Sequence, residues 1–110
     1  GGFASLRYNC GKITVEDNTK IILKIKGDGK KYQLRIRANN SDYFSYTSPF
    51  KTSGEWEEIS INLDMMYPSF RGSRLNKENF NQKEIVQISI LIGNKKKENF
   101  KLIIDSIVLK

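Results

Sequence analysis

The sequence contains no histidine, one cysteine and only two prolines. Histidine is the usual base for a serine or cysteine nucleophile, and cysteine and histidine are the main zinc ligands, so we expect neither kind of site. The single Cys10 cannot form an intrachain disulfide, which excludes a disulfide-stapled secreted domain and favours a reducing compartment. No apolar run approaches the roughly 20 residues that span a bilayer.

The residues that are present favour β-strands. Isoleucine is abundant, and five tyrosines and six phenylalanines add further side chains that suit strands. At 110 residues the chain fits one domain, and it can bury roughly two-thirds of its unfolded surface. The net charge of +7 favours an acidic partner, such as nucleic acid, anionic lipid or an acidic protein surface. A solubilising surface rich in lysine is the alternative.

Alternating apolar and polar residues predict about seven short strands that are separated by turns. Two stacked sheets of such strands would form an all-β sandwich. Outside the hairpin described next, the predicted strands cover residues 3–8, 43–50, 57–63, 85–92 and 100–109. The last of these has apolar residues on both faces, which predicts a central strand that is covered on both sides.

Residues 20–39 form the clearest unit in the sequence. Two runs of alternating residues flank a glycine-rich turn at residues 27–30, which predicts a β-hairpin. Pairing across this turn would place Lys26 opposite Lys31. The outer face of the hairpin would then carry cations and no acid: Lys20, Lys24, Lys26, Lys31, Arg35 and Arg37. This basic hairpin face is predicted either to bind an anionic partner or simply to face solvent.

Residues 65–83 differ in character from the rest of the chain. They contain Pro68, Gly72 and mixed charges, which predicts a long surface loop with one helical turn near residues 77–80. Long loops within a compact domain are often functional. The alternative is a structural connection that crosses between the two sheets.

The acidic residues do not form a pattern typical of a catalytic or metal site. Glu57 and Glu58 are consecutive in a predicted strand, so they point to opposite faces and cannot act as a glycosidase pair. Asp28 and Asp105 are separated acids, whereas calcium needs a cage of six to eight oxygens. Asp28 before Gly29 is better explained as a turn former. We therefore predict no metal and no cofactor, with a structural calcium left open.

Aromatic side chains provide the second signal for binding. Trp56 is out of phase with the core face marked by Ile59, unless a bulge intervenes. Exposed aromatics stack on sugar rings and also anchor protein interfaces. Tyr43, Tyr46 and Trp56 are therefore candidate stacking platforms. For Trp56, closure of one end of the core is the alternative.

Five stretches of the chain, taken in order, resemble a known family. They are GGFASLR at 1–7, KGDGKKY at 26–32, FKTSGEW at 50–56, PSFRG at 68–72, and FKL with DSI within 100–107. These stretches are similar to the complex I intermediate-associated protein family of the thirty-kilodalton class. The resemblance implies a galactose-binding-like β-sandwich or jelly roll, related to carbohydrate-binding modules. Mitochondrial members of the family are assembly chaperones of respiratory complex I (NADH:ubiquinone oxidoreductase) and do no chemistry.

One departure from the family concerns the start of the domain. Family domains begin several dozen residues earlier, with upstream strands and another Gly-Gly motif. We therefore expect residues 1–110 to be one domain that corresponds to the C-terminal two-thirds of the family domain, with an exposed strand edge. The chain opens with Gly1-Gly2 rather than Met, so a processed chain or fragment is expected and no targeting segment is visible. The resemblance implies a cytoplasmic protein in bacteria and a mitochondrial matrix protein in eukaryotes.

The resemblance also suggests roles for individual residues. The positions expected to be architectural are Asp28, Gly29, Tyr32, Gly72 and Asp105. Arg71 is the leading candidate for a partner contact or for an ion pair that fixes its loop. With the residues of the basic hairpin face, the exposed aromatics and residues 67–74 added, the candidate binding residues are Arg71, Trp56, Tyr67, Arg74, Tyr43, Tyr46, Arg35, Arg37 and Lys24.

Three functions follow from these observations. The leading hypothesis is a non-catalytic module that binds complex I assembly intermediates through the basic hairpin face and residues 67–74. The second hypothesis is a carbohydrate-binding module that uses the exposed aromatics. The third is binding of an anionic surface, either lipid through peripheral membrane contact or, less favoured, nucleic acid, through the basic hairpin face. The oligomeric state stays open.

Overall fold

The computed structural model describes residues 5–92 and 101–110. These residues form nine β-strands and one short 3-10 helix, η1. In chain order the elements are β1 (Ser5–Thr14), β2 (Lys20–Lys26), β3 (Lys31–Arg37), β4 (Ser45–Lys51), β5 (Trp56–Asn62), η1 (Leu63–Met65), β6 (Tyr67–Phe70), β7 (Ser73–Arg74), β8 (Glu84–Ile92) and β9 (Ile103–Leu109).

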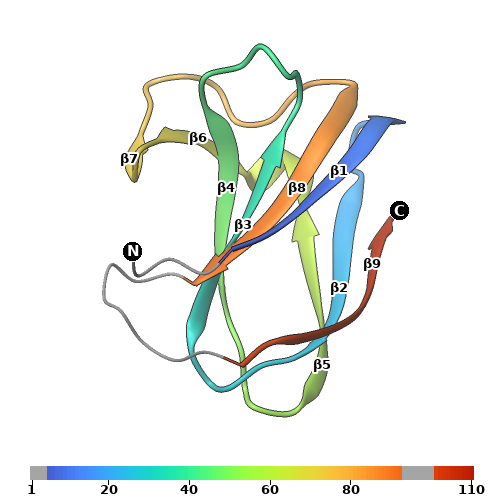
Figure 1. Cartoon of the computed structure of the whole chain (residues 1–110). Helices are drawn as coiled ribbons and strands as arrows, with labels where there is room; N and C mark the ends of the chain where they lie inside the picture. Colours follow the sequence, from blue (N-terminus) through green and yellow to red (C-terminus); the bar gives the residue numbers. More distant parts are fainter. Residues whose placement is uncertain (1–4, 93–100) are drawn as a thin grey trace.

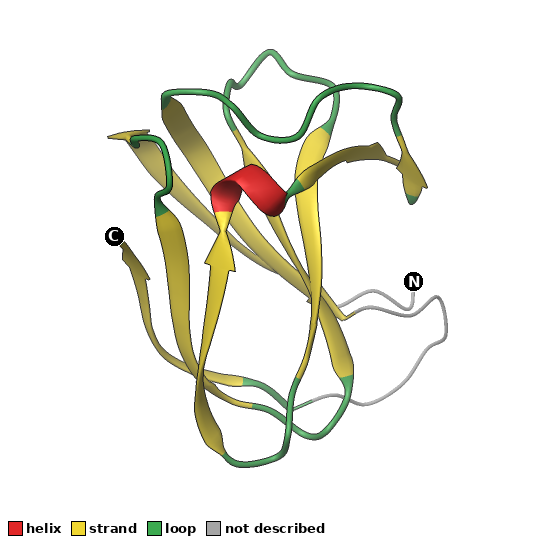
Figure 2. Ribbon diagram, turned by 180° about the vertical axis from the view of Figure 1, so that it is seen from behind, coloured by secondary structure: helices red, strands yellow, loops and turns green. Residues whose placement is uncertain are grey.

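The strands form two antiparallel sheets that face each other (Figure 1). The larger sheet has the strand order β1-β8-β3-β4-β6-β7, and the smaller sheet has the order β5-β2-β9. Figure 2 shows η1 leading from the end of β5, in the smaller sheet, into β6, in the larger one. The predicted β-sandwich is therefore confirmed, and it is consistent with the galactose-binding-like fold that the resemblance implies.

The hydrophobic core lies between the sheets and is filled by alternate residues of each strand. The central strands contribute many of the buried side chains: Ile21, Leu23 and Ile25 from β2, Tyr32, Leu34 and Ile36 from β3, and Ile88, Ile90 and Ile92 from β8. Complete burial of an isoleucine or leucine stabilises a fold by about 1.5–3 kcal/mol. Because buried and more exposed residues alternate along these strands, each sheet has a second face that points away from the core.

The predicted hairpin of residues 20–39 is wrong. β2 pairs with β5 and β9, whereas β3 pairs with β4 and β8, so residues 27–30 cross from one sheet to the other. Alternation indicates which face of a strand is buried, and a hairpin and a crossing between sheets bury the same side chains. The basic hairpin face therefore does not exist. Lys24 is exposed on the outer face of the smaller sheet, while Arg35 and Arg37 lie on that of the larger sheet.

β9 is an edge strand of the smaller sheet, not the central strand that its two apolar faces predict. Its register against β2 shifts between Ser106 and Ile104, which leaves Asp105 as the extra residue of a β-bulge. The bulge resets the alternation, and as a result Ile103 and Val108 point outward with 45% and 40% of their surface exposed.

Residues 65–83 are not one long loop. β6 pairs with β4, and β7 pairs with β6, so this segment supplies two strands of the larger sheet. No helical turn forms near residues 77–80, and the short helix η1 lies earlier, directly before β6. The amide of Phe80 donates to the carbonyl of Met66 at 2.9 Å, and the Phe80 ring packs against Tyr46. Phe80 and the buried Met66 thus both anchor this segment to the core.

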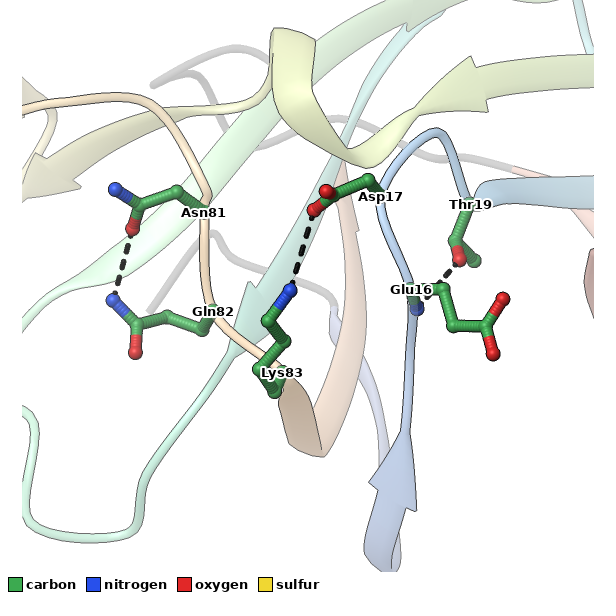
Figure 3. Close-up of polar contacts among 6 residues, drawn as sticks. All are labelled: Glu16, Asp17, Thr19, Asn81, Gln82 and Lys83. Carbon is green, nitrogen blue, oxygen red and sulfur yellow. Dashed lines mark hydrogen bonds and ion pairs between the residues drawn. The ribbon is translucent and has the colours of Figure 1, made fainter.

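Polar contacts connect the β1–β2 turn to the segment before β8 (Figure 3). The amide of Glu16 donates to the hydroxyl of Thr19 at 2.9 Å within the turn. Lys83 reaches Asp17 at 3.4 Å, with both side chains largely exposed. Exposed ion pairs of this kind contribute about 0–1 kcal/mol, so this pair positions the turn more than it stabilises the fold.

Candidate functional site

The outer face of the larger sheet carries the main cluster of polar and cationic side chains. Gln33, Arg35 and Arg37 alternate with the buried residues of β3 and point away from the core. In the register of the sheet, Arg35 lies beside Thr47 of β4 and Ser89 of β8. The strands on both sides of β3 therefore surround Arg35 with small hydroxyl side chains.

Two shallow hollows meet at Arg35. The first has a volume of about 130 Å³ and is lined by Arg35, Ile36, Arg37, Ser45, Gln87, Ser89 and Leu91. The second has a volume of about 210 Å³ and is lined by Gln33, Arg35, Thr47, Tyr67, Ser69, Gly72 and Arg74. We call the two hollows together the arginine groove. The described residues that line it include three arginines and neither aspartate nor glutamate.

The floor and wall of the arginine groove are ordered by short contacts. The hydroxyls of Thr47 and Ser69 are buried and lie 2.7 Å apart, so each satisfies the other. The guanidinium of Arg74 lies 4.7 Å from the centre of the Tyr67 ring, which is a cation–π contact. These contacts hold the aromatic wall against the polar floor.

Two arginines of the groove are incompletely paired. Nη2 of Arg35 donates to Oε1 of Gln33 at 2.9 Å. The Nε atoms of Arg35 and Arg37 are shielded from solvent and find no acceptor among the described residues. A buried donor without an acceptor typically costs about 1–3 kcal/mol. The groove thus presents partly desolvated cations, which suit a carboxylate or another planar anion.

The structure brings four of the predicted binding residues together and separates the others. Arg35, Arg37, Tyr67 and Arg74 all line the arginine groove. Lys24 is on the opposite side of the sandwich, where its Nζ lies 3.9 Å from the Asp105 carboxylate.

Tyr46 is not an exposed stacking platform, in contrast to the prediction. It points into the core, with 5% of its surface exposed, and its ring meets Phe80 edge-on at 5.1 Å. Burial raises the pKa of its hydroxyl above the usual value. The prediction failed because the phase of β4 could not be assigned from an aromatic-rich segment with apolar residues on both faces.

Tyr43 and Trp56 are exposed as predicted, at 57% and 50%, but they do not share a surface. Tyr43 precedes β4 and meets the Phe70 ring edge-on at 5.4 Å. Trp56 begins β5 and lies beside Lys26 in the smaller sheet. The two rings therefore cannot act as one platform.

Arg71 and Gly72 form the turn between β6 and β7, and both have positive φ, at 51° and 81°. The guanidinium of Arg71 lies 5.0 Å from the centre of the Phe70 ring. Within the described residues, Arg71 thus contacts an aromatic ring and forms no ion pair with an acid. Positive φ suits Gly72 because this conformation is unfavourable for residues with a Cβ.

Asp28 fixes the crossing between the sheets. Its carboxylate accepts hydrogen bonds from the amide of Lys30 at 3.2 Å, the hydroxyl of Tyr32 at 2.9 Å and the amide of Lys101 at 2.8 Å. Partial burial by itself raises the pKa of Asp28, but these hydrogen bonds and the charge of Lys30 outweigh it, so the pKa lies below its usual value. The carboxylate thus holds the crossing against the start of the last strand.

Several residues that shape these sites were not identified from the sequence. Thr52 is buried, and its hydroxyl accepts from the amide of Gly29 at 3.0 Å and donates to the carbonyl of Lys30 at 2.9 Å. Two of the family-like stretches, 26–32 and 50–56, therefore pack against each other. Thr47 was missed because the phase of β4 is ambiguous in the sequence and because its partner Ser69 fell in the predicted loop.

Other groups that could carry chemistry are weak candidates. Burial raises the pKa of the Cys10 thiol, which disfavours the reactive thiolate. Its sulfur lies 3.8 Å from the carbonyl oxygen of Ile85. Within residues 5–92 and 101–110, no three potential metal ligands come together.

These features define a β-sandwich with an open cationic groove on its larger sheet. Residues 1–104 match the family described as Complex I intermediate-associated protein 30 (CIA30). The chain belongs to this family, which confirms the resemblance of the five stretches. Among curated proteins, none matches the sequence. In the part of the chain that the structure describes, no helix has the length and apolar character needed to cross a membrane.

Proposed function

We propose that this chain is a non-catalytic protein-binding module in the assembly of respiratory complex I, and that it contacts its partner through the arginine groove. Membership of the CIA30 family supports the assembly role. The observation that carries the choice of surface is the position of Arg35, which is shared by both hollows and is flanked by Arg37 and Arg74.

The composition and shape of the groove support contact with a protein. Arginine and tyrosine are enriched among the residues that dominate protein interfaces. The hollows, at about 130 and 210 Å³, are smaller than the roughly 300–1,000 Å³ of typical small-molecule sites. A shallow, open surface of this kind fits a side chain or backbone segment of a partner better than an enclosed ligand.

A carbohydrate ligand has less support. Tyr43 and Trp56 belong to different surfaces, and the ring of Tyr67 is covered by Arg74. A sugar-binding face usually offers an open aromatic ring, and no such ring lies in the described part of the groove.

The proposal predicts that Arg35→Gln and Arg74→Gln, made together, weaken capture of complex I assembly intermediates by at least about tenfold. The full chain would be immobilised, and bound complex I subunits or assembly factors would be identified by mass spectrometry. Lys20→Gln is the matched control, because it removes one exposed cation from the smaller sheet. Thermal unfolding by circular dichroism would verify that each variant is folded.

Two results would overturn this assignment. One is undiminished capture by the folded double variant. The other is calorimetric binding of an oligosaccharide that is lost on Trp56→Ala or Tyr43→Ala, since this outcome would favour the carbohydrate function instead.

A further inference from the structure

The cationic side chains of the larger sheet follow the repeat of an extended chain. Gln33, Arg35 and Arg37 are every second residue of β3, so their Cα atoms are separated by about 7 Å along the strand. A partner segment in an extended conformation has the same spacing between alternate side chains. Groups at alternate positions of such a segment could therefore meet Arg35 and Arg37 in turn.

Further cations lie on this face beyond the groove. Lys31 and Lys51 are exposed and lie directly opposite each other in the β3–β4 register. Like charges in directly opposed positions disfavour the sheet. Cations thus follow β3 from Lys31 to Arg37, and Arg74 adds another from β7.

We propose, building on the function proposed above, that the arginine groove receives an extended acidic segment of the partner protein. Aspartate or glutamate residues alternate with other residues in this segment. Their carboxylates pair with the guanidinium groups of Arg35 and Arg37, which line the groove. Arg74, held against Tyr67, closes one side of the bound segment.

An acidic protein segment fits this surface better than a nucleic acid. Duplex binding typically involves 6–10 phosphate contacts along a continuous basic track. Here the exposed lysines of β2, Lys20 and Lys24, lie on the opposite side of the sandwich from Arg35. Single strands are usually held by open aromatic rings, but the Tyr67 ring is already covered.

The test uses a short dye-labelled peptide in which glutamate alternates with serine, and a matched peptide with glutamine in place of glutamate. Fluorescence anisotropy with the full chain should show binding of the glutamate peptide at least about tenfold tighter than the glutamine peptide. Arg35→Gln should remove most of this difference, while Lys20→Gln should leave it unchanged. Amide shifts on addition of the peptide should map to β3, β4 and β6 and not to β2.

Competition experiments separate the alternatives. A peptide with the same number of glutamates in one consecutive block should bind more weakly, because its side chains do not match the strand repeat. Tighter binding of single-stranded DNA at equal charge would overturn the inference in favour of nucleic acid. Full displacement by inorganic phosphate at millimolar concentration would indicate a simple anion site and would also overturn it.

The outcomes distinguish this inference from the proposed function. One outcome is that capture of assembly intermediates depends on Arg35 and Arg74 while the glutamate and glutamine peptides bind equally. In that case the inference of an acidic partner segment is wrong, and the protein-binding function stands. The opposite outcome is that the glutamate peptide binds more tightly than the glutamine peptide, but capture does not depend on these arginines. In that case the acidic segment is supported, and the proposal that the arginine groove binds assembly intermediates is wrong.

Discussion

Arg35 occupies the middle of the larger sheet, beside Thr47 and Ser89. One of its nitrogens is paired with Gln33, but its Nε is shielded from solvent without an acceptor in the described chain. An unpaired buried donor works against folding. An unpaired donor at this position is consistent with the binding role that we propose for Arg35.

Replacing Arg35 should accordingly separate stability from binding. We expect Arg35→Met to leave the free energy of unfolding unchanged or to raise it by about 1 kcal/mol, because methionine keeps the apolar stem and removes the unpaired donor. Urea denaturation would measure the change. A loss of more than about 1 kcal/mol would mean that the guanidinium has a structural role.

Asp28 should make stability depend on pH. Its pKa is lower in the folded chain than in the unfolded chain, so its contribution is present above the unfolded value of about 4 and is lost as the pH falls through the lowered folded value. We expect Asp28→Asn to lower the melting temperature at pH 7. The difference from the native chain should narrow as the pH falls below about 4.

The measurement for Asp28 is a series of thermal melts from neutral to acidic pH. Asp42→Asn is a suitable control, because it removes one carboxylate from the β3–β4 connection, away from the crossing. If the difference in melting temperature between Asp28→Asn and the native chain stays constant across the pH series, the hydrogen-bonded carboxylate is not the source of the lost stability.

At the scale of elements, the crossing between β2 and β3 depends on close packing with the end of β4. A Cβ added at Gly27 would overlap the side chain of Thr52, whereas one added at Gly29 would meet nothing within 4 Å. Glycine at position 27 therefore lets the crossing approach Thr52 closely. Glycine at position 29 suits its positive φ of 85°, which residues with a Cβ rarely adopt.

These two glycines should respond differently to the same substitution. Gly27→Ala should lower the free energy of unfolding by about 1–3 kcal/mol through overpacking, and Gly29→Ala by about 1–2 kcal/mol through backbone strain. Combining Thr52→Gly with Gly27→Ala tests whether contact with Thr52 is the cause. The double variant should lose less free energy of unfolding than the sum of the losses in the two single variants. Strict additivity in urea denaturation would contradict the proposed contact.

How much of each element could be predicted depends on what alternation can and cannot determine. Alternation correctly placed Ile21, Leu23 and Leu34 in the core, because a strand with one apolar face buries that face. Alternation could not decide which strands pair, since both partners of β2 and one partner of β3, the strand β8, are remote in sequence. In β9 the bulge at Asp105 changed the phase, and nothing in the local pattern indicates a bulge.

At the scale of the whole molecule, the candidate site could be predicted only in part. Arg35 and Arg37 were predicted as candidate binding residues from their charge, and Tyr67 and Arg74 from their place in residues 67–74, and the fold brings all four together. Lys24 was assigned to the same surface because a hairpin was assumed. Thr47 and Ser69 were missed because their contact exists only when β6 joins β4. Which residues share a surface thus depends on the strand order of the sheets.

The separation of β2 and β3 into opposite sheets also has a kinetic consequence. Neither sheet can grow from this pair of neighbouring strands, and β1 must wait for β8, which brings Ser5 beside Leu91. Chains with such remote pairings pay the entropy of loop closure before the contacts form, and they typically fold in milliseconds to seconds. We therefore expect the apolar strands β2 and β8 to stay unpaired until late in folding, which would make a newly made chain prone to aggregate during that interval.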